Sequence, residues 1–394
     1  MASSSRHRSR AAPGSPVAVA VNLLFCVPGQ VGGSEDYLVR QMLGLAELAA
    51  ASSSADRGAS LDVVPTVYAP QGFAAAHPDL AEVVHVVEAP IDGRSRPKRV
   101  LYDNTWLFEQ SAGSGLIHHG GGTVPVRGHQ PIVLTIHDLQ YRTFPQYFSR
   151  LKRLYLGHSM PRSARRAKVI AVPSEYVRGT VIEAYDVDPE DVVVVPHGME
   201  RGLGRESTDE VTLRTRYALG DGPVIVLPAI THPHKGHRFL LEVMATHWCD
   251  PALRLVLTGG RGIADADVER DIVERGLSDR VVRTGRVSRA DRDGLLQMAT
   301  AMTFPSEYEG FGAPVIEAMA LGAPVICSDR TCLPDVAGDA AIVLPLEVEA
   351  WAGALDAALA RRDELVAAGR ERATMFSAAR SAQALLGAYE LALS

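Results

Sequence analysis

Two glutamates eight positions apart, Glu309 and Glu317, mark the stretch of this sequence that is best suited to chemistry. Gly310 and Gly312 lie between them, and glycine lets a backbone approach a ligand closely. Pro314 suits the first position of a helix, because the N–H that proline lacks would be unpaired there. The free N–H groups of such a helix attract an anion such as a diphosphate. We therefore expect a loop and a helix N-terminus that hold phosphates, with a carboxylate on either side.

The same stretch has a plainer interpretation, in which the acids only favour the positive end of a helix. Its full sequence, PSEYEGFGAPVIEAMALGAPVICSD, resembles the Glu-x7-Glu signature of the family-4 retaining glycosyltransferases (glycosyl transferases group 1). The match continues through Leu333–Pro345. The resemblance implies that Glu309 contacts the donor sugar and takes part in catalysis, and that Glu317 contacts the nucleotide ribose. It also implies that the donor site includes Gly310, Phe311 and Gly312.

Composition excludes several classes of protein. The chain has 394 residues, enough for two domains of ordinary size, and it is 46% hydrophobic and 22% charged, as a soluble globular protein is. A net charge of −6 implies no general attraction to nucleic acid. The four cysteines have no zinc-ligand spacing, so we expect reduced, packed thiols.

The N-terminal sequence predicts a tail and then a first strand. Residues 1–15 are polar and basic, and we expect them to be disordered. The apolar run Val17–Val27 is too short to span a bilayer and continues without a clear cleavage site, so it predicts neither a membrane span nor a signal peptide. We expect a cytoplasmic protein, with the inner face of the membrane as a second possibility.

Two features of the N-terminal half follow predicted strands. Gly32 and Gly33 stand between the strand Val17–Phe25 and a helical pattern, which is either a phosphate-binding geometry or a tight turn. His137 stands at the carboxyl end of the strand Pro131–Leu139, where open α/β sheets bind ligands, although local backbone groups are an alternative partner. The resemblance implies that the two glycines lie beside the donor diphosphate and that His137 lies near the donor sugar and the acceptor.

The second half adds a candidate cation. Lys235 stands just before a predicted helix, where an ammonium group meets a phosphate, although a loop lysine is more often solvated. The resemblance implies that Lys235 holds the donor diphosphate. Many members of the family carry an arginine six residues before this lysine, whereas this chain has Ala229. Either one cation is missing, or Arg238 or Arg261 supplies it.

Other donor-side loops are placed by the resemblance alone. Gly259 ends a predicted buried strand and matches a donor-side loop of the family, and Gly285 matches the backbone near the nucleotide base. His118 and His119 also end a predicted strand, but a turn role is as good an explanation, and we assign them no chemistry.

The segment Arg150–Lys168 holds seven lysines or arginines, with Leu151, Leu154 and Leu156 between them. It is either a helix that packs its leucines inward and exposes its charges, or an interfacial helix that binds anionic lipid. Enzymes of the resembled family often work on lipid-linked acceptors, so peripheral membrane contact stays open.

Alternating strand and helix patterns predict an α/β protein. The resemblance implies the GT-B fold, two Rossmann-like domains with parallel sheets that face each other across a cleft. We expect an acceptor domain at 16–203, a nucleotide-sugar domain at 204–375, and a C-terminal helix at 376–394 that crosses back to the first domain. Closure of the cleft would bring His137 to the sugar.

The expected reaction moves a hexose, mannosyl or glucosyl, from a UDP- or GDP-linked donor to an acceptor hydroxyl, with retention of configuration. The acceptor would be a glycan, a lipid-linked molecule or a small molecule, in polysaccharide or glycolipid synthesis. No cofactor and no metal is expected. The alternatives are a nucleotide-sugar epimerase, a phosphorylase, which would normally need a pyridoxal phosphate that no motif suggests, and a silent homologue that only binds a nucleotide-sugar.

Overall fold

The computed structural model describes residues 16–51, 61–128 and 130–394. Contacts divide the chain into two compact units. The N-terminal unit runs to Val172 and includes Thr180–Val195 and Ser381–Ser394, and the C-terminal unit comprises Pro173–Gly179 and Pro196–Arg380. The tail predicted at residues 1–15 lies outside the described residues.

The N-terminal unit is built on a parallel sheet of seven strands in the order β3-β2-β1-β4-β5-β6-β7. Its strands are β1 (Val17–Asn22), β2 (Val63–Pro70), β3 (His85–Ala89), β4 (Leu116–His119), β5 (Ile132–Thr135), β6 (Val169–Val172) and β7 (Val192–Val194). Its helices are α1 (Gly33–Ala51), α2 (Phe73–Ala76), α3 (Pro78–Val83), α4 (Arg96–Asn104), α5 (Trp106–Gln110), α6 (Gln140–Thr143) and α7 (Arg150–Arg166), together with most of α8 (Glu175–Tyr185) and of α18 (Ala378–Leu393).

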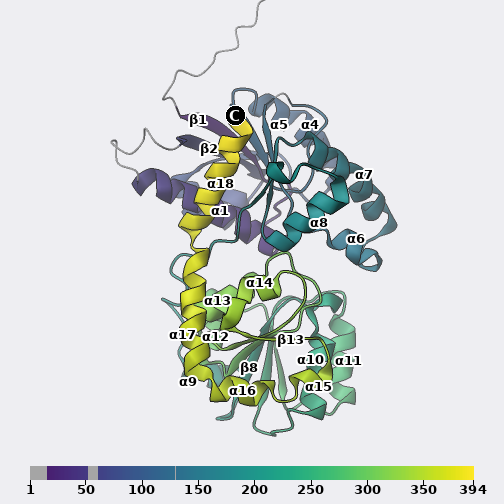
Figure 1. Ribbon diagram of the computed structural model, residues 1–394, viewed down its shortest axis with the longest axis vertical. Coiled ribbons are helices and arrows are strands. Elements are labelled where there is room, and N and C mark those ends of the chain that lie inside the picture. The colour runs from purple at the N-terminus through teal and green to yellow at the C-terminus, as the bar shows by residue number, and fades with distance from the viewer. Residues whose placement is uncertain (1–15, 52–60, 129) are drawn as a thin grey trace, which may run out of the picture. The chain divides into compact units, whose positions relative to one another are not determined.

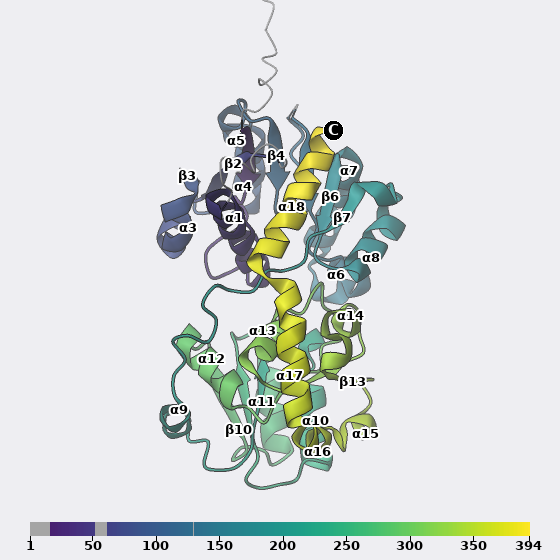
Figure 2. The same ribbon diagram turned by 60° about the vertical axis from the view of Figure 1, so that its left-hand side comes forward.

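Alternate residues of the buried strands face the same apolar cluster, as a period of two requires. Val19 and Val21 of β1 pack in one cluster with Leu38 of α1 and with Leu385 and Tyr389 of α18. The two helices therefore cover one face of this sheet (Figures 1 and 2). The C-terminal residues from Ser381 onward are thus part of the N-terminal unit.

Two histidines of β4 join this core by hydrogen bonds. His118 is fully buried, and its ring nitrogens bond the Tyr389 hydroxyl at 2.9 Å and the Thr135 hydroxyl at 2.7 Å. His119 is also buried, and its Nδ1 accepts from the Asn22 amide at 3.0 Å. His118 therefore links β4 to β5 and to α18, and His119 links β4 to β1 within the sheet. Both residues end β4, and neither lies in the turn considered from the sequence.

These histidines should make the N-terminal unit sensitive to acid. Burial lowers the pKa of both His118 and His119 to about 3, from an unfolded value of about 6.5. Between these values the unfolded chain binds protons that the folded unit does not, so the stabilisation is complete above about pH 6.5 and is lost as the pH falls towards 3. Acidification from pH 7 to pH 5 should lower the free energy of unfolding by about 2 kcal/mol per histidine.

Urea titrations at the two pH values test this expectation, with hydrogen-exchange protection of the β4 amides as the readout for this unit. His118→Gln keeps a hydrogen-bonding side chain but cannot titrate in this range. The loss of stability between pH 7 and pH 5 should therefore shrink by about 2 kcal/mol in this variant. An equal loss in the variant and the wild type would contradict the assignment.

The C-terminal unit contains a parallel sheet of six strands in the order β10-β9-β8-β11-β12-β13. Its strands are β8 (Val224–Pro228), β9 (Arg254–Thr258), β10 (Val281–Gly285), β11 (Ala301–Phe304), β12 (Val325–Ser328) and β13 (Ile342–Leu344). Its helices are α9 (Glu210–Arg216), α10 (His237–Thr246), α11 (Asp265–Glu274), α12 (Arg289–Met298), α13 (Ala313–Leu321), α14 (Leu333–Ala337), α15 (Val348–Trp351), α16 (Ala354–Ala360) and α17 (Arg362–Ala373).

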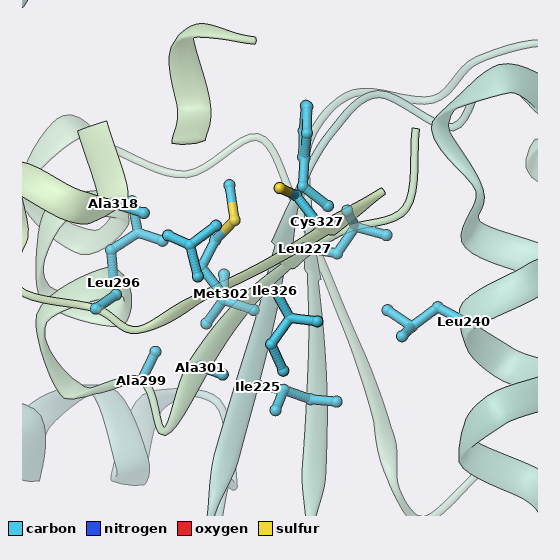
Figure 3. Packing of buried hydrophobic residues seen from close by; sticks show 14 of the residues in the cluster. Ile225, Leu227, Leu240, Leu296, Ala299, Ala301, Met302, Ala318, Ile326 and Cys327 are labelled. Atoms are coloured by element: carbon cyan, nitrogen blue, oxygen red, sulfur yellow. The ribbon is translucent and has the colours of Figure 1, made fainter. Parts of the chain in front are cut away.

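Helices cover both faces of this second sheet. Figure 3 shows Leu240 of α10 on one side of the strands and Leu296 of α12 with Ala318 of α13 on the other. A strand buried on both faces is apolar along its whole length, which explains runs such as VIVL in β8 and VIC in β12.

Both sheets confirm the predicted α/β class with parallel, Rossmann-like sheets. In each sheet the strand order reverses once, between β1 and β4 in the first and between β8 and β11 in the second. Open α/β sheets bind ligands outside the carboxyl ends of the strands at such a point. The fold therefore points to the loops that follow these four strands.

Among the described helices, none combines the length and the apolar character needed to cross a bilayer.

All four cysteines are free thiols, and three of them are buried, but Cys249 is exposed and so departs from the expectation of packed thiols.

Candidate functional site

The structure brings together Lys235 and Glu309, which the sequence singled out separately. Lys235 ends a short 3-10 turn (Pro233–Lys235) after β8, and Glu309 lies in the loop after β11. The Lys235 Nζ donates a hydrogen bond to the Glu309 Oε1 at 2.6 Å, and the Ser306 hydroxyl donates to the same oxygen at 2.6 Å. The two charged side chains are only 18% and 11% exposed. A largely buried ion pair thus occupies the point where the strand order reverses.

Backbone contacts hold this pair in place. Gly236 has a φ of +71°, and a Cβ built there would lie 2.0 Å from the carbonyl oxygen of Pro305. Only glycine allows the Lys235 loop to lie so close to the loop that carries Glu309. The Glu309 amide donates to the Thr331 hydroxyl at 3.1 Å, and the Cys332 thiol donates to the Glu309 carbonyl at 3.4 Å. Sequence reasoning missed these supports, although a glycine directly after the lysine was a visible signal.

Helix α13 begins directly after the glutamate loop. Gly312 precedes it with a φ of +86°, and a Cβ built there would meet Leu333 at 2.6 Å. Ala313 is the first helical residue. Pro314 therefore occupies the second position, and the prediction that it occupies the first is wrong. Pro314 still removes one N–H from a turn that has no partner for it. The Val315 amide of this turn donates to the Gly312 carbonyl at 2.9 Å, and the amides that precede it stay the predicted anion-binding groups.

The residues between the two glutamates differ in what they offer a ligand. The Gly310 carbonyl accepts a hydrogen bond from the Ser174 hydroxyl at 2.7 Å. Phe311 is 4% exposed and stacks on the His197 ring, with centroids 4.6 Å apart and planes 6° apart. The phenyl ring of Phe311 therefore serves packing, and its backbone is what remains for a donor.

Glu317 occupies the fifth position of α13 and is 8% exposed. Burial by itself lowers the pKa of Arg292 on α12, but the carboxylates of Glu317, Asp293 and Glu200 raise it above its ordinary value. The Arg292 guanidinium group therefore lies close enough to the Glu317 carboxylate for their opposite charges to interact.

Gly259 and Gly285 line a pocket of about 460 Å³ in the C-terminal unit, together with Ala229. Lys235 and Glu309 are not among the residues that line it. A Cβ at Gly259 would meet the Ala229 carbonyl oxygen at 2.3 Å, so this glycine permits close packing of the β8 and β9 loops. The pocket lies against the edge strand β10 and α11.

Of the two arginines named from the sequence as replacements for the one absent at Ala229, Arg261 lines the same pocket as Ala229, whereas Arg238 does not. Arg238 donates to Asp271 at 2.7 Å, and the Arg261 side chain is 88% exposed. Arg283, which the sequence analysis missed, lines the same pocket as Ala229 and pairs with Asp265 and Glu269. Two arginines therefore line this pocket: Arg261 from the loop after β9 and Arg283 from β10.

In the N-terminal unit, His137 follows β5 and its ring has defined partners. Nε2 donates to the Gly120 carbonyl at 2.9 Å, and the Tyr37 ring lies edge-on with centroids 5.5 Å apart. Burial lowers the pKa of His137, so the ring is neutral near pH 7. Because Nε2 carries the proton, Nδ1 is left as an acceptor. The backbone contact considered from the sequence is present, and it orients the ring.

Gly32 and Gly33 stand where α1 begins, at the carboxyl side of β1. A Cβ built at either glycine would meet nothing within 4 Å, so open space adjoins this loop. Glu35 anchors the loop, because its carboxylate accepts from the Gly29 amide at 3.1 Å and contacts the His77 ring at 2.8 Å.

Within the described ranges, no group of three or more histidines, cysteines, aspartates or glutamates is arranged to hold a metal ion. The candidate groups that the described residues provide are an ammonium–carboxylate pair, a helix N-terminus and a neutral imidazole.

Known proteins match over both units. The family model described as glycosyl transferases group 1 matches residues 213–375, and that described as glycosyltransferase family 4 matches residues 47–201. O-antigen chain mannosyltransferase B of Escherichia coli is 30% identical over 283 residues, which cover 70% of this chain and 74% of that protein. MMP alpha-(1->4)-mannosyltransferase of Mycolicibacterium hassiacum is 27% identical over 319 residues, 77% of this chain and 72% of that protein.

Solved structures also resemble the chain. The structure of Anabaena Alr3699/HepE in complex with UDP and glucose has a TM-score of 0.71 at 16% identity, and the match covers 95% of this chain and 99% of that one. At this identity the likeness shows the fold, which is that of the GT-B glycosyltransferases.

Proposed function

The chain belongs to the glycosyl transferases group 1 family and is a glycosyltransferase, and from this premise we propose that it transfers a hexose from a nucleotide-diphosphate sugar to an acceptor hydroxyl with retention of configuration. The resemblance of the Glu309–Glu317 stretch is thereby confirmed as a family relationship. The donor sugar that we propose is mannose or glucose, because the matched relatives include mannosyltransferases and the matched Anabaena structure contains UDP and glucose. The products would be glycans, polysaccharides or glycolipids.

The observation that carries the proposal is the Lys235–Glu309 pair at the carboxyl ends of β8 and β11. Cleavage of the bond between sugar and diphosphate builds negative charge on the leaving group. The ammonium of Lys235 and the first amides of α13 would stabilise that charge. Positive charge grows at the anomeric carbon, as in other glycosyl transfers, and the Glu309 carboxylate would offset it. Glu317 would hold the ribose.

The N-terminal unit contributes His137 to this proposal. A neutral imidazole with Nδ1 as acceptor can receive a hydrogen bond from a sugar hydroxyl. Gly32 and Gly33 leave open space for the donor diphosphate beside the start of α1. We propose no metal and no cofactor, because a side-chain cation and backbone dipoles would neutralise the charge of the leaving group.

A silent homologue that only binds nucleotide-sugar is the second candidate, and Ala229 is the observation that favours it. The ion pair, which a pure binding protein has no need to bury, favours catalysis. An epimerase of similar architecture would release no transferred sugar.

Release of UDP or GDP from a panel of nucleotide-sugars, with and without EDTA, tests the proposal. Release from one donor that is unaffected by EDTA is the expected result, because the proposed site uses no metal. Nucleotide binding without release from any donor, even when candidate acceptors are added, would favour the silent homologue. Conversion of one donor into another would favour the epimerase.

Helix α7 supports a further proposal about partners, namely contact with an anionic membrane surface. Leu151 and Leu154 are 78% and 73% exposed, so the expectation that the leucines pack inward is wrong for these two. Arg150 and Arg153 are exposed beside them. Apolar and cationic side chains at one surface of a helix are typical of binding to anionic lipid headgroups.

The double substitution Leu151→Ser and Leu154→Ser should lower binding to vesicles of phosphatidylcholine and phosphatidylglycerol about tenfold or more, because each buried leucine contributes about 1.5–3 kcal/mol. Co-sedimentation measures this effect. Leu359→Ser, at a residue of α16 that is 49% exposed, is the matched control and should bind like the wild type. Equal sedimentation of all three proteins would rule out this surface.

A further inference from the structure

The N-terminal unit contains a cavity of about 270 Å³. None of the residues assigned to the donor lines it, although Val31, which does, directly precedes Gly32. It opens at the carboxyl ends of β1 and β4, because Asn22 is the last residue of β1 and Gly121 follows β4. These are the two strands between which the order of the first sheet reverses, so the cavity lies where such sheets bind ligands.

Three cations line this cavity. Arg96 and Arg99 lie one turn apart on α4, and Lys152 comes from α7. Among the residues that the structure describes, no carboxylate oxygen lies within 4 Å of any of the three. Their heads have aromatic or backbone neighbours instead: Arg96 lies over the Tyr155 ring at 5.4 Å, and Lys152 lies over the Phe148 ring at 4.6 Å.

The one acid that lines the cavity leaves it positive. Asp103 accepts a hydrogen bond from the Asn22 amide at 2.9 Å, and burial raises its pKa to about 6 although Asn22 and Arg99 act to lower it. Even when Asp103 is ionised, and with Asp138 close enough to Lys152 to act on its charge, two carboxylates do not balance three cations. Burial lowers the pKa of Arg99 and of Lys152, and the charge of Arg96 lowers both further. The cations repel one another in a partly dehydrated space, and a bound anion would relieve both costs.

We propose that this cavity binds a phosphoryl group of the acceptor and thereby selects acceptors that carry a phosphate or a diphosphate. The proposal rests on the proposed function in that it identifies the bound molecule as the acceptor. Two guanidinium groups and an ammonium match the several oxygens and the double charge of a phosphate better than the two oxygens of a carboxylate. The cavity is smaller than the roughly 300–1,000 Å³ of sites that enclose a whole drug-sized ligand, so it suits one headgroup of a larger molecule.

Binding to the full-length protein tests this assignment with two probes. Glucose 6-phosphate represents a soluble phosphorylated acceptor and is titrated calorimetrically against glucose as its uncharged counterpart. Phosphatidylcholine vesicles that contain phosphatidic acid represent a lipid-borne phosphate and are compared with phosphatidylcholine alone. The variants are Arg99→Met and Lys152→Met. Lys98→Met is the matched control, because Lys98 lies on α4 beside Arg99 but is exposed and does not line the cavity.

We expect each cavity variant to weaken binding of one probe about tenfold or more, because each loses a single charge-assisted hydrogen bond to the phosphate. Lys98→Met should change the affinity for that probe less than about twofold. Loss with glucose 6-phosphate alone identifies a soluble acceptor, and loss with the vesicles alone identifies a lipid. Arg99 bonds the Phe25 carbonyl at 3.4 Å, so Lys152→Met, which breaks no such bond, guards against misfolding.

Equal affinity of both cavity variants and the control for both probes would overturn the proposal. Neither probe requires sugar transfer. If the protein binds phosphate in this cavity but turns over no donor, only the proposed function is refuted. If the protein turns over its donor but the cavity variants bind both probes as the wild type does, only the proposed phosphate site is refuted.

Discussion

Glu309→Gln should reduce kcat for sugar transfer by about 10²–10³-fold while nucleoside diphosphate binding stays close to that of the wild type. Glutamine keeps the size of the side chain and an oxygen that can accept from Lys235 and Ser306, which both lie 2.6 Å from the Glu309 Oε1. It removes the negative charge that would offset the positive charge at the anomeric carbon. The loss should therefore appear in the transition state and leave the ground-state grip on the nucleotide intact.

Rates of transfer from labelled donor, combined with calorimetry of UDP and GDP, separate these two quantities. Glu364→Gln is the matched control: Glu364 is exposed on α17 and pairs with Arg361 three residues away, so its loss should leave turnover unchanged. Wild-type turnover in Glu309→Gln would remove this residue from the catalytic step. A parallel loss of nucleotide affinity would show that its carboxylate serves mainly to hold Lys235.

The local patterns of the sequence predicted the individual residues of this site but not that Lys235 and Glu309 are in contact. Glu309 and Lys235 each stand in a glycine-bearing loop after a buried apolar strand, and that arrangement is visible in sequence. Their contact spans 74 residues and exists because β8 and β11 are neighbours in the sheet. No short-range signal specifies strand order, so the ion pair required the tertiary structure.

The cavity proposed to bind a phosphoryl group was even less predictable from the sequence. Arg96, Arg99 and Asp103 lie in a nine-residue helix without a motif, and their spacing suits an ordinary solvated helix face. They become a cavity because α7 brings Lys152 against them beside the ends of β1 and β4. Helix α7 itself was predicted, but periodicity does not tell which face the fold covers, and Leu151 is exposed.

Lys235→Met should damage both stages of the reaction, in contrast to Glu309→Gln. The ammonium is proposed to hold the diphosphate before and after the bond breaks, so its loss should weaken nucleoside diphosphate binding about tenfold or more and lower kcat by about 10²–10³-fold. Calorimetry and transfer rates measure the two effects. Lys168→Met is the matched control, because Lys168 is exposed after α7. Wild-type nucleotide affinity in Lys235→Met would contradict the assigned role.

The double variant Lys235→Met, Glu309→Gln decides whether the two residues act as one unit. Lys235→Met leaves the Glu309 carboxylate, only 11% exposed, without its cation, which is costly for a buried charge. Part of the damage in that variant should therefore come from the unpaired carboxylate, and Glu309→Gln should remove that part. If the residues act together, the double variant should lose no more turnover than the worse single variant. Fully additive losses would mean that the lysine and the glutamate contribute independently, and that the ion pair is only the resting arrangement of two separate contacts with the donor.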